Sequence, residues 1–468
     1  MEDRVRLLNA APVRTAARYV LYWAQMNRRV ESNHALAFAA HLANQLDLPL
    51  LCYEGLTCSY PYASDRLHTF ILEGVPDMAK GLKRIGAGYV FHLRRKHSDP
   101  DDALYQVAKD AAALVTDDYP TFIAARHNAS VPAKIGIPYY AVDSSCVVPM
   151  NRHEKREYAA YTIRPKIRRM LPAYLKPAVL PALKHRFRLP VPGFHLEVAR
   201  KDIPALAASC EIDHSAPPSL AYSGGAAQAE KHLRRFLEER LRRYARERND
   251  PSAHATSDLS PYLHFGHIAS LSVALEAREH ARERHLVADE FLEELIVRRE
   301  LAFNFARYSK RHGALEGNIP AWAIRSLREH ARDPRPYLYR YEQFERAETH
   351  DALWNAAQKE MLLRGKIHGY YRMYWGKKII EWSRTPEEAL DTMIRLHDRW
   401  ALDGRDPNTY TNILWCFGLH DRPWSERPVF GMVRYMSLEG MRRKTGVDAY
   451  LEEIAGLERT GKDPFRLE

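Results

Sequence analysis

Residues 368–382 read HGYYRMYWGKKIIEW and predict a helix that is both aromatic and basic. Trp375 and Trp382 are seven residues apart, so in a helix both indoles lie on one face, about 10 Å apart along the axis. Aromatic residues at helical spacing usually pack in a core, and spacing alone favours that interpretation. The stretch also carries Arg372, and Trp354 lies one predicted helix earlier. Neighbouring indoles can relay an electron, which is a second interpretation that requires a redox cofactor nearby.

The sequence around this stretch shows two kinds of pattern. Helical periodicity dominates from residue 226 onward, whereas residues 18–145 alternate between short apolar strands and amphipathic helices. The alternation predicts an α/β, doubly wound, Rossmann-like domain. No GxGxxG follows its first strand, so a nicotinamide dinucleotide site is not indicated. We expect an α/β domain over residues 1–180, a Pro- and Gly-punctuated connector over 181–225 and an all-α domain over 226–468.

The composition indicates a globular protein with a polyanionic partner. The net charge of +11 favours nucleic acid, although a generally basic cytoplasmic protein would carry the same charge. No apolar run reaches the length of a membrane span, and the N-terminus lacks a signal-peptide layout, so we interpret it as a short arm before the first strand. The five cysteines form no CxxC, and Cys416 with His420 supplies too few ligands for zinc. We therefore expect a reduced, cytoplasmic protein without a metal.

Two polar stretches are candidates for ligand contacts. Residues 256–260, TSDLS, place hydroxyl groups at a predicted helix start, where backbone N–H groups and the helix dipole suit a phosphate. Ordinary helix capping explains the same pattern. Residues 402–408, LDGRDPN, bring Asp403 and Asp406 close together on one loop. Such a pair suggests a metal, a charge network with arginines, or hydrogen bonds to ligand hydroxyl and ring N–H groups, with a plain Asp/Gly/Pro turn as the simplest alternative.

A third region, residues 415–444, interleaves cations with tryptophan. Its members are Trp415, Trp424, Arg422, Arg427, Arg434, Arg442, Arg443 and Lys444. Cations between aromatic rings suit phosphate contact combined with base stacking. A solvated basic face is the alternative, but clustered exposed aromatic residues usually mark a binding surface.

Seven motifs then occur in a characteristic order: EYAAYTIRPKI, LSPYLHFG, FLEELIVRREL, DALWNAAQ, GYYRMYWGKKIIEW, LDGRDPN and HDRPWSERPVFGMVRYM. Over nearly the whole chain they resemble the class II cyclobutane pyrimidine dimer (CPD) photolyases of the photolyase/cryptochrome family. The resemblance implies a deoxyribodipyrimidine photo-lyase that binds FAD in its helical domain and repairs UV-damaged DNA under blue light. In that reaction excited, fully reduced FAD passes an electron to a dimer flipped out of the duplex, and the electron returns after the ring splits. A monomer is expected, located with the nucleoid if prokaryotic or in the nucleus if eukaryotic.

The resemblance also assigns flavin contacts and an electron path. The flavin contacts are Tyr244, Thr256, Ser257, Asp258, Leu259, Ser260, Arg372, Asp403, Asp406 and Asn408. Among them Arg372 and Asp403 are expected to form an ion pair beside the isoalloxazine ring. Trp375, Trp354 and Trp382 match the chain that refills the flavin with electrons, with Trp375 nearest to the flavin.

The lesion contacts follow from the same resemblance. Glu294 matches the carboxyl group that hydrogen-bonds the damaged bases, and Met373 and Trp415 match residues that pack on the dimer. The remaining contacts, to the lesion strand or to the gap left by flipping, are Arg248, Asn249, Asp421, Arg422 and Arg434.

Two positions depart from the family pattern. His397 stands where the family usually has Asn near flavin N5, and because histidine titrates near neutral pH we expect it to influence the redox state of the flavin. A tolerated substitution on a helix face is the alternative. Phe303 stands where an acidic residue is common.

Several functional questions stay open on the sequence. The antenna pigment of the N-terminal domain is 8-hydroxydeazaflavin, a folate, a second flavin such as FMN, or absent. The alternative functions are a cryptochrome-like photoreceptor and a (6-4) photolyase, a reaction that normally needs histidine in the lesion pocket.

Overall fold

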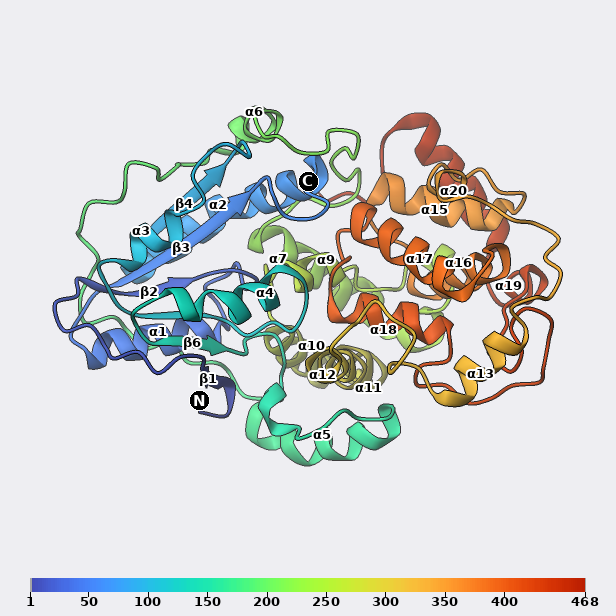
Figure 1. Ribbon diagram of the computed structural model, residues 1–468, viewed down its shortest axis with the longest axis horizontal. Helices are drawn as coiled ribbons and strands as arrows, with labels where there is room; N and C mark the ends of the chain where they lie inside the picture. The colour runs from blue at the N-terminus through green and yellow to red at the C-terminus, as the bar shows by residue number, and fades with distance from the viewer. Residues whose placement is uncertain (1, 468) are drawn as a thin grey trace.

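A computed structural model describes residues 2–467 and contains a six-stranded sheet beside a larger helical region (Figure 1). The sheet order is β1-β6-β5-β2-β3-β4. The strands are β1 (Val5–Leu7), β2 (Tyr19–Trp23), β3 (Leu50–Thr57), β4 (Gly88–Arg94), β5 (Ala111–Asp117) and β6 (Tyr139–Val142). All neighbouring strands are parallel except β1, which pairs antiparallel with β6. The predicted short arm is therefore wrong for Val5–Leu7, because these residues pair along the edge of β6 as a strand.

Helices cover both faces of this sheet, as its continuous apolar strands require. Val20 and Tyr22 of β2 pack with α1 (His34–Gln45) and α2 (Asp65–Ile85). Leu21 and Trp23 point to the opposite face and pack with α3 (Ala103–Ala108). A further helix, α4 (Phe122–Ser130), follows β5. The α/β fold predicted from the sequence is confirmed.

The rest of the chain is mostly helical, with irregular stretches that include residues 175–199 and 209–225. Its longer helices are α5 (Ala160–Tyr174), α7 (Ala226–Arg235), α10 (Ser270–Arg284), α12 (Arg299–Tyr308), α13 (Ala321–Glu329), α15 (Ala352–Arg364), α16 (Gly369–Trp382), α17 (Pro386–Trp400), α18 (Pro407–Cys416) and α20 (Val447–Thr460). The short ones are α6 (Ile203–Ala208), α8 (Leu241–Glu247), α9 (Ser260–His264), α11 (Asp289–Leu292), α14 (Tyr341–Glu345) and α19 (Leu438–Lys444). Two π-helical segments, η5 (Phe236–Arg240) and η7 (Glu293–Arg298), continue α7 and α11. The 3₁₀ turns are η1 (Glu2–Arg4), η2 (Pro132–Lys134), η3 (Met150–Arg152), η4 (Arg200–Asp202) and η6 (Pro251–Ala253).

The helix predicted from HGYYRMYWGKKIIEW is α16, and it lies in the middle of the helical core. It packs against α15, α17 and α18, and Tyr371, Tyr374 and Trp375 are almost completely buried there. The N-cap is His368, whose ring nitrogen accepts a hydrogen bond from the Tyr370 N–H. None of the helices within residues 2–467 combines the length and apolarity needed to cross a membrane.

A buried arginine joins the two halves of the molecule. Arg66, in the first turn of α2, is 1% exposed. Its guanidinium donates to the carbonyl oxygens of Met361 (2.9 Å) and Trp400 (2.7 Å) at the ends of α15 and α17. It also donates to the carbonyls of Pro217 and Leu362. One cation thereby satisfies helix-end carbonyls that would otherwise be buried without a donor.

Replacing Arg66 by Met should lower the free energy of unfolding by about 3 kcal/mol or more, because several buried carbonyls lose a charged donor at once. Urea unfolding followed by circular dichroism measures this. Arg84→Met is the matched control, since Arg84 lies on the same helix but pairs with Glu31 on the exposed surface. If the free energy of unfolding fell by the same small amount in both variants, Arg66 would not hold the two halves together.

Candidate functional site

The helical region encloses a cavity of about 650 Å³, within the range of pockets that bind cofactors. Its walls come from α8, η7, α16 and α18 and from the segment that follows α18. Twelve of the predicted site residues line it: Tyr244, Arg248, Asn249, Thr256, Glu294, Arg372, Met373, Trp375, Asn408, Trp415, Asp421 and Arg434. The fold therefore brings residues from three distant parts of the sequence to one site.

Polar atoms in and beside the cavity wall lack partners within residues 2–467. These buried atoms are Arg372 Nε, His368 Nε2, His420 Nε2 and both ring nitrogens of His397. Buried polar groups are normally hydrogen-bonded, so the atoms on the cavity wall are available to bind a ligand. The donors and the volume of the cavity fit a large, polar, partly aromatic cofactor such as FAD.

The predicted ion pair between Arg372 and Asp403 is present. Arg372 Nη2 lies 3.0 Å from Asp403 Oδ2, and the Ser260 hydroxyl donates to the same oxygen at 2.7 Å. Burial alone would raise the pKa of Asp403, but Arg372 opposes this and the pKa falls to about 2. A permanent carboxylate consequently fixes the Arg372 guanidinium at the cavity wall.

Asp406, like Asp403, lies behind the cavity wall and does not line the cavity itself. Its carboxylate accepts a hydrogen bond from the Tyr119 hydroxyl (2.6 Å), lies 3.3 Å from His264 Nδ1, and caps α18 through the Asn408 N–H (2.8 Å). Tyr119 follows β5, so this contact crosses between the α/β and helical regions. Of the interpretations left open for the two carboxylates, a charge and hydrogen-bond network is the one found. No cluster of metal-ligating side chains occurs among the described residues.

Residues 256–260 do not form the helix cap that their sequence suggests. The helix that follows, α9, has only five residues, and Leu259 rather than a hydroxyl residue is its N-cap, without a side-chain hydrogen bond. Leu259 is buried in the core. The Thr256 side chain lines the cavity and donates to Asp258 Oδ1 at 3.1 Å. Ser257 is partly exposed and does not line the cavity.

Asp258 instead anchors two cations beside the cavity. Arg240 Nη1 lies 2.7 Å and Lys366 Nζ 2.6 Å from its carboxylate oxygens. Burial would raise the pKa of Asp258, but Lys366 and Arg240 hold it well below its usual range. The sequence pattern did not point to Arg240 or Lys366, which lie 18 and 108 residues from Asp258 in the sequence.

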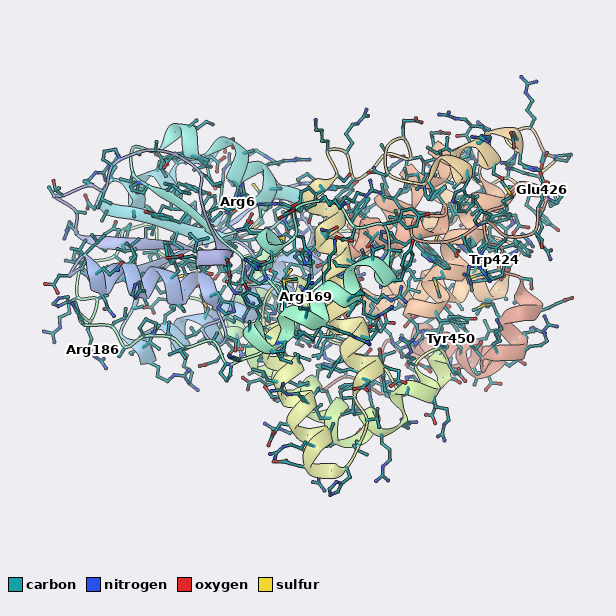
Figure 2. All side chains as sticks on the ribbon, turned by 90° about the horizontal axis from the view of Figure 1, so that it is seen from below. Arg6, Arg169, Arg186, Trp424, Glu426 and Tyr450 are labelled. Carbon is teal, nitrogen blue, oxygen red and sulfur yellow. The ribbon has the colours of Figure 1, made fainter. Side chains whose placement is uncertain are left out.

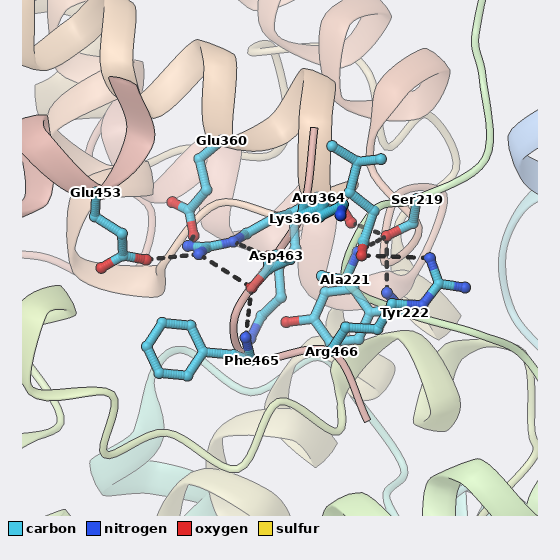
Figure 3. A network of polar contacts seen from close by, with 12 residues as sticks. Ser219, Ala221, Tyr222, Glu360, Arg364, Lys366, Glu453, Asp463, Phe465 and Arg466 are labelled. Atoms are coloured by element: carbon cyan, nitrogen blue, oxygen red, sulfur yellow. Dashed lines mark hydrogen bonds and ion pairs between the residues drawn. The ribbon is translucent and has the colours of Figure 1, made fainter. Parts of the chain in front are cut away.

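The two cations border a smaller cavity that is also lined by the C-terminal residues Asp463 and Phe465. Figure 3 shows the polar network around Arg364 and Lys366 that these C-terminal residues join. Arg364 is the centre of this network, with Nε 2.5 Å from Asp463 and Nη2 2.6 Å from Glu453. Phe465 stacks against His254, at 3.9 Å between ring centroids. The network ties the last described residues to the wall of the site.

The three predicted tryptophans form a continuous chain of ring contacts, called here the tryptophan stack, that ends on the main cavity; Trp375 and Trp354 are parallel, whereas Trp354 and Trp382 meet edge-on. Trp375 lines the cavity and stacks on Trp354 with 6.3 Å between centroids and 6° between planes. Trp354 in turn lies 6.1 Å from Trp382. Trp375 Nε1 donates to the Gln358 side chain and Trp354 Nε1 to the Trp375 carbonyl, which fixes the rings. The rings belong to a packed core and also form a short path between buried indoles, so both interpretations of their spacing hold.

His397 lies behind Trp375 and is completely buried. The two rings make an edge contact at 6.4 Å. Burial, followed by the nearby Arg372, lowers the pKa of His397 to about 3. The expectation that this histidine titrates near neutral pH is therefore wrong, because a neutral ring is the stable form at that depth.

The mouth of the cavity carries the predicted lesion contacts. Arg248 Nη1 lies 2.7 Å from Glu294 Oε1, and Arg434 pairs with Asp421 at 2.8 Å. The Arg434 guanidinium also lies over the rings of Trp415 and Trp424, at 5.3 and 4.1 Å. Arg422 does not line the cavity and is exposed beside Trp424.

One buried lysine and two histidines in or beside the cavity wall were not found from the sequence. Lys377 is 0% exposed, donates to the Cys416 carbonyl at 2.6 Å and lies 5.1 Å from the Trp415 ring centre. Burial lowers its pKa to about 8. His368 and His420 line the cavity, and burial lowers the pKa of each to about 3. The only sequence signal for Lys377 was its place in the helix that carries Trp375.

Phe303 has a clear packing role. Its ring is fully buried, meets Tyr119 edge-on at 5.4 Å and lies under the Arg299 guanidinium at 4.4 Å. Phe303, where the family commonly has an acidic residue, therefore fills the junction between the two halves of the molecule with an apolar ring.

A second large cavity, of about 380 Å³, lies at the carboxyl ends of the parallel strands. Its lining includes Trp23 of β2, Tyr53 of β3 and His92 of β4. Helix α4 contributes Arg126 and His127. This edge is where doubly wound sheets bind their ligands.

A Rossmann-like domain joined to a helical domain with a tryptophan stack on its central cavity defines the photolyase/cryptochrome class of proteins. A cryptochrome from Synechocystis sp. PCC6803 has the same fold, with a TM-score of 0.70 over 94% of this chain and 90% of that one, at 16% identity. The DNA photolyase family profile matches residues 20–184. Proteins named deoxyribodipyrimidine photo-lyase from Methanothermobacter thermautotrophicus and Potorous tridactylus are 41% and 36% identical, over 97% of this chain and 98% and 85% of their own lengths. The chain belongs to the DNA photolyase family.

Replacing Asp403 by Asn should lower the free energy of unfolding by about 3 kcal/mol at pH 7, because Arg372 is left buried without its counter-charge. The folded pKa of Asp403 lies below that of an unfolded aspartate, so the carboxylate stabilises the fold above about pH 4 and loses this effect as pH falls toward 2. In urea unfolding, the difference in free energy of unfolding between wild type and variant should therefore become smaller as the pH falls from about 4 toward 2. Asp391→Asn, which disrupts an exposed pair with Arg395, is the matched control. If the Asp403 variant lost no more free energy of unfolding than the control, Asp403 would not be the counter-charge that holds Arg372.

Proposed function

We propose that this protein is a light-driven DNA-repair lyase that splits cyclobutane pyrimidine dimers. The observation that carries the proposal is a single cavity lined both by Trp375, the end of the tryptophan stack, and by Glu294, Met373 and Trp415. The near full-length relatives named deoxyribodipyrimidine photo-lyase support it. The motifs quoted above further support placement among the class II enzymes.

The inner part of the cavity would hold FAD. Tyr244, Thr256, His368, Arg372 and Asn408 line that part, and Arg372 and His368 offer the unpaired donors described above. Bound and fully reduced, FAD supplies the electron that light transfers to the dimer and that returns after the ring opens. The Arg372–Asp403 pair fixes a positive group there, and the neutral ring of His397 adds no second charge.

The outer part of the cavity would hold the flipped-out dimer. Glu294 is partly exposed and paired with Arg248, so it can exchange that partner for the N–H groups of the damaged bases. Trp415 and Met373 offer an apolar platform, and Lys377 beneath Trp415 keeps the ring in place. The remaining predicted contacts would face the lesion strand or the gap left by flipping. They are Arg434, Asp421, Asn249 and the exposed Arg422. A dimer pairs poorly, so it costs less to extrude than a normal base.

The cavity histidines bear on the alternative (6-4) reaction, which normally needs a histidine in the lesion pocket. His368 and His420 are present, but burial lowers the pKa of both to about 3. Neither ring is in its positively charged, doubly protonated form at neutral pH, which favours CPD repair.

We place an antenna chromophore in the cavity at the carboxyl ends of the strands. Its aromatic wall and its cations Arg94, Arg126 and Lys134 suit a flat, partly anionic pigment such as 8-hydroxydeazaflavin, a folate or FMN. We propose a monomer acting where the DNA is, in the nucleoid region of a prokaryote or the nucleus of a eukaryote. The proposed domain limits remain residues 1–180, 181–225 and 226–468.

Purified protein with reduced FAD should restore dimer-containing DNA under blue light and leave it unchanged in the dark. Quantifying dimers by chromatography after enzymatic digestion of the DNA measures this. Light-independent binding without loss of dimers, as expected of a photoreceptor or a plain DNA-binding protein, would refute the proposal.

Replacing Trp375 by Phe should abolish photoreduction of oxidised FAD, because the indole nearest the cavity is removed from the stack. Repair by enzyme that was reduced chemically beforehand should stay near wild type. Photoreduction is followed by absorbance at the flavin bands, and repair is followed by the dimer assay. Trp322→Phe, outside the stack, is the control and should preserve both. If repair and photoreduction fell together in the Trp375 variant, the stack would not be a separate refilling path.

A further inference from the structure

The mouth of the cavity is continued outward by a basic and aromatic helix that the site described so far does not include. Helix α5 packs on η7, and Arg164 of α5 holds Glu293 with Nη2 2.7 Å from Oε1. The next residue, Glu294, lines the cavity, so α5 is attached directly to its rim. The side chain of Arg156, just before α5, is close enough to the cavity residue His420 to lower the pKa of that ring, after burial.

The outer face of α5 carries a strong positive charge. Residues 155–176 include seven Lys or Arg residues and one acidic residue, Glu157. Glu157 is paired with Lys166, and Arg164 with Glu293. Within residues 2–467, no acidic group pairs with the exposed side chains of Lys155, Arg168, Arg169 or Lys176. Figure 2 shows Arg169 on this helix near the middle of the molecule.

Two exposed tyrosines lie at the end of the helix nearest to the cavity. Tyr158 is 53% and Tyr161 64% exposed, and their rings meet edge-on at 6.2 Å. Tyr161, Pro165, Arg168 and Pro172 follow one another at helical spacing on the face opposite the buried Ile163 and Ile167. We call the exposed residues Lys155, Tyr158, Tyr161, Arg168, Arg169 and Lys176 the α5 patch.

We propose that the α5 patch binds the phosphate backbone of the DNA duplex that flanks the lesion. The choice of DNA rests on the proposed function, and charge complementarity supports it. Arg, Lys and Tyr hydroxyl groups are common donors to phosphate oxygens, and such contacts position a duplex without reading its sequence. The 15 residues of α5 are about 22 Å long, the length of roughly six base pairs. The patch therefore holds one arm of the duplex while the dimer occupies the cavity.

Titrating duplex binding against salt tests this directly. Arg168→Ala/Arg169→Ala/Lys176→Ala should reduce the slope of log K against log salt by about 2.7, because three phosphate contacts are lost. Binding of an oligonucleotide of about five nucleotides centred on the dimer should stay near wild type, since it is too short to reach the patch. Tyr161→Phe should weaken duplex binding by about 2- to 10-fold through the loss of one hydroxyl donor.

The matched control is Lys184→Ala/Arg186→Ala/Arg188→Ala, which removes the same charge from another exposed site. Arg186 lies at the far edge of the α/β region in Figure 2, away from α5. This variant should keep the wild-type slope, and circular dichroism should show that both triple variants are folded. An unchanged slope in the α5 variant, or equal changes in both variants, would overturn the proposal.

The same titration with undamaged duplex separates the two proposals. Wild-type protein that shows the α5-dependent slope but leaves dimers intact under light would contradict the repair function and keep the patch as a DNA contact. Normal repair with a normal slope in the α5 variant would contradict the patch alone.

Discussion

The site depends on keeping the carboxylates of one buried loop charged and paired. In residues 402–408, Asp403 holds Arg372 at the cavity, while Asp406 binds Tyr119 from the α/β region and caps α18. The Thr121 hydroxyl donates to the Arg405 carbonyl at 2.8 Å and adds a second contact across the same junction. Unpaired, each buried carboxylate would cost several kcal/mol or take up a proton. The loop can therefore hold its shape only when the two halves of the chain are assembled around it.

This constraint links the fold to the chemistry. The sheet supplies Tyr119 and Thr121 through the loop after β5, and α2 supplies Arg66, which holds the ends of α15 and α17. Those helices and α16 carry Trp354, Trp375 and His397. The indoles are thus fixed at contact distance with their N–H groups satisfied, in surroundings too dry for His397 to accept a proton. Rigid placement costs no reorganisation when charge moves, which is what electron transfer through a protein requires.

Much of this could be predicted from the sequence because its signals are local. Short apolar runs and period-3.6 patterns predicted the sheet and the helices, and the motif resemblance predicted the Arg372–Asp403 pair. Predictions that depended on three-dimensional surroundings were wrong. The hydroxyl groups of residues 256–260 suggested a cap, but the helix that follows is only one turn long and Asp258 turns to Arg240 and Lys366. His397 was expected to titrate near neutral pH, as a solvated histidine does. The ring is completely buried, and burial lowers its pKa. Lys377 and Phe303 have roles that only packing across elements reveals.

The central claim is that light moves an electron from the cavity to the dimer and back, so that repair consumes no reductant. The most direct measurement counts dimers restored per electron supplied, with chemically reduced protein, excess dimer-containing DNA, no added donor and repeated light flashes in the absence of oxygen. The account predicts many dimers restored per protein, with the absorbance of the reduced flavin unchanged at the end. Repair that stops after one dimer per protein, with the flavin oxidised in step, would contradict it.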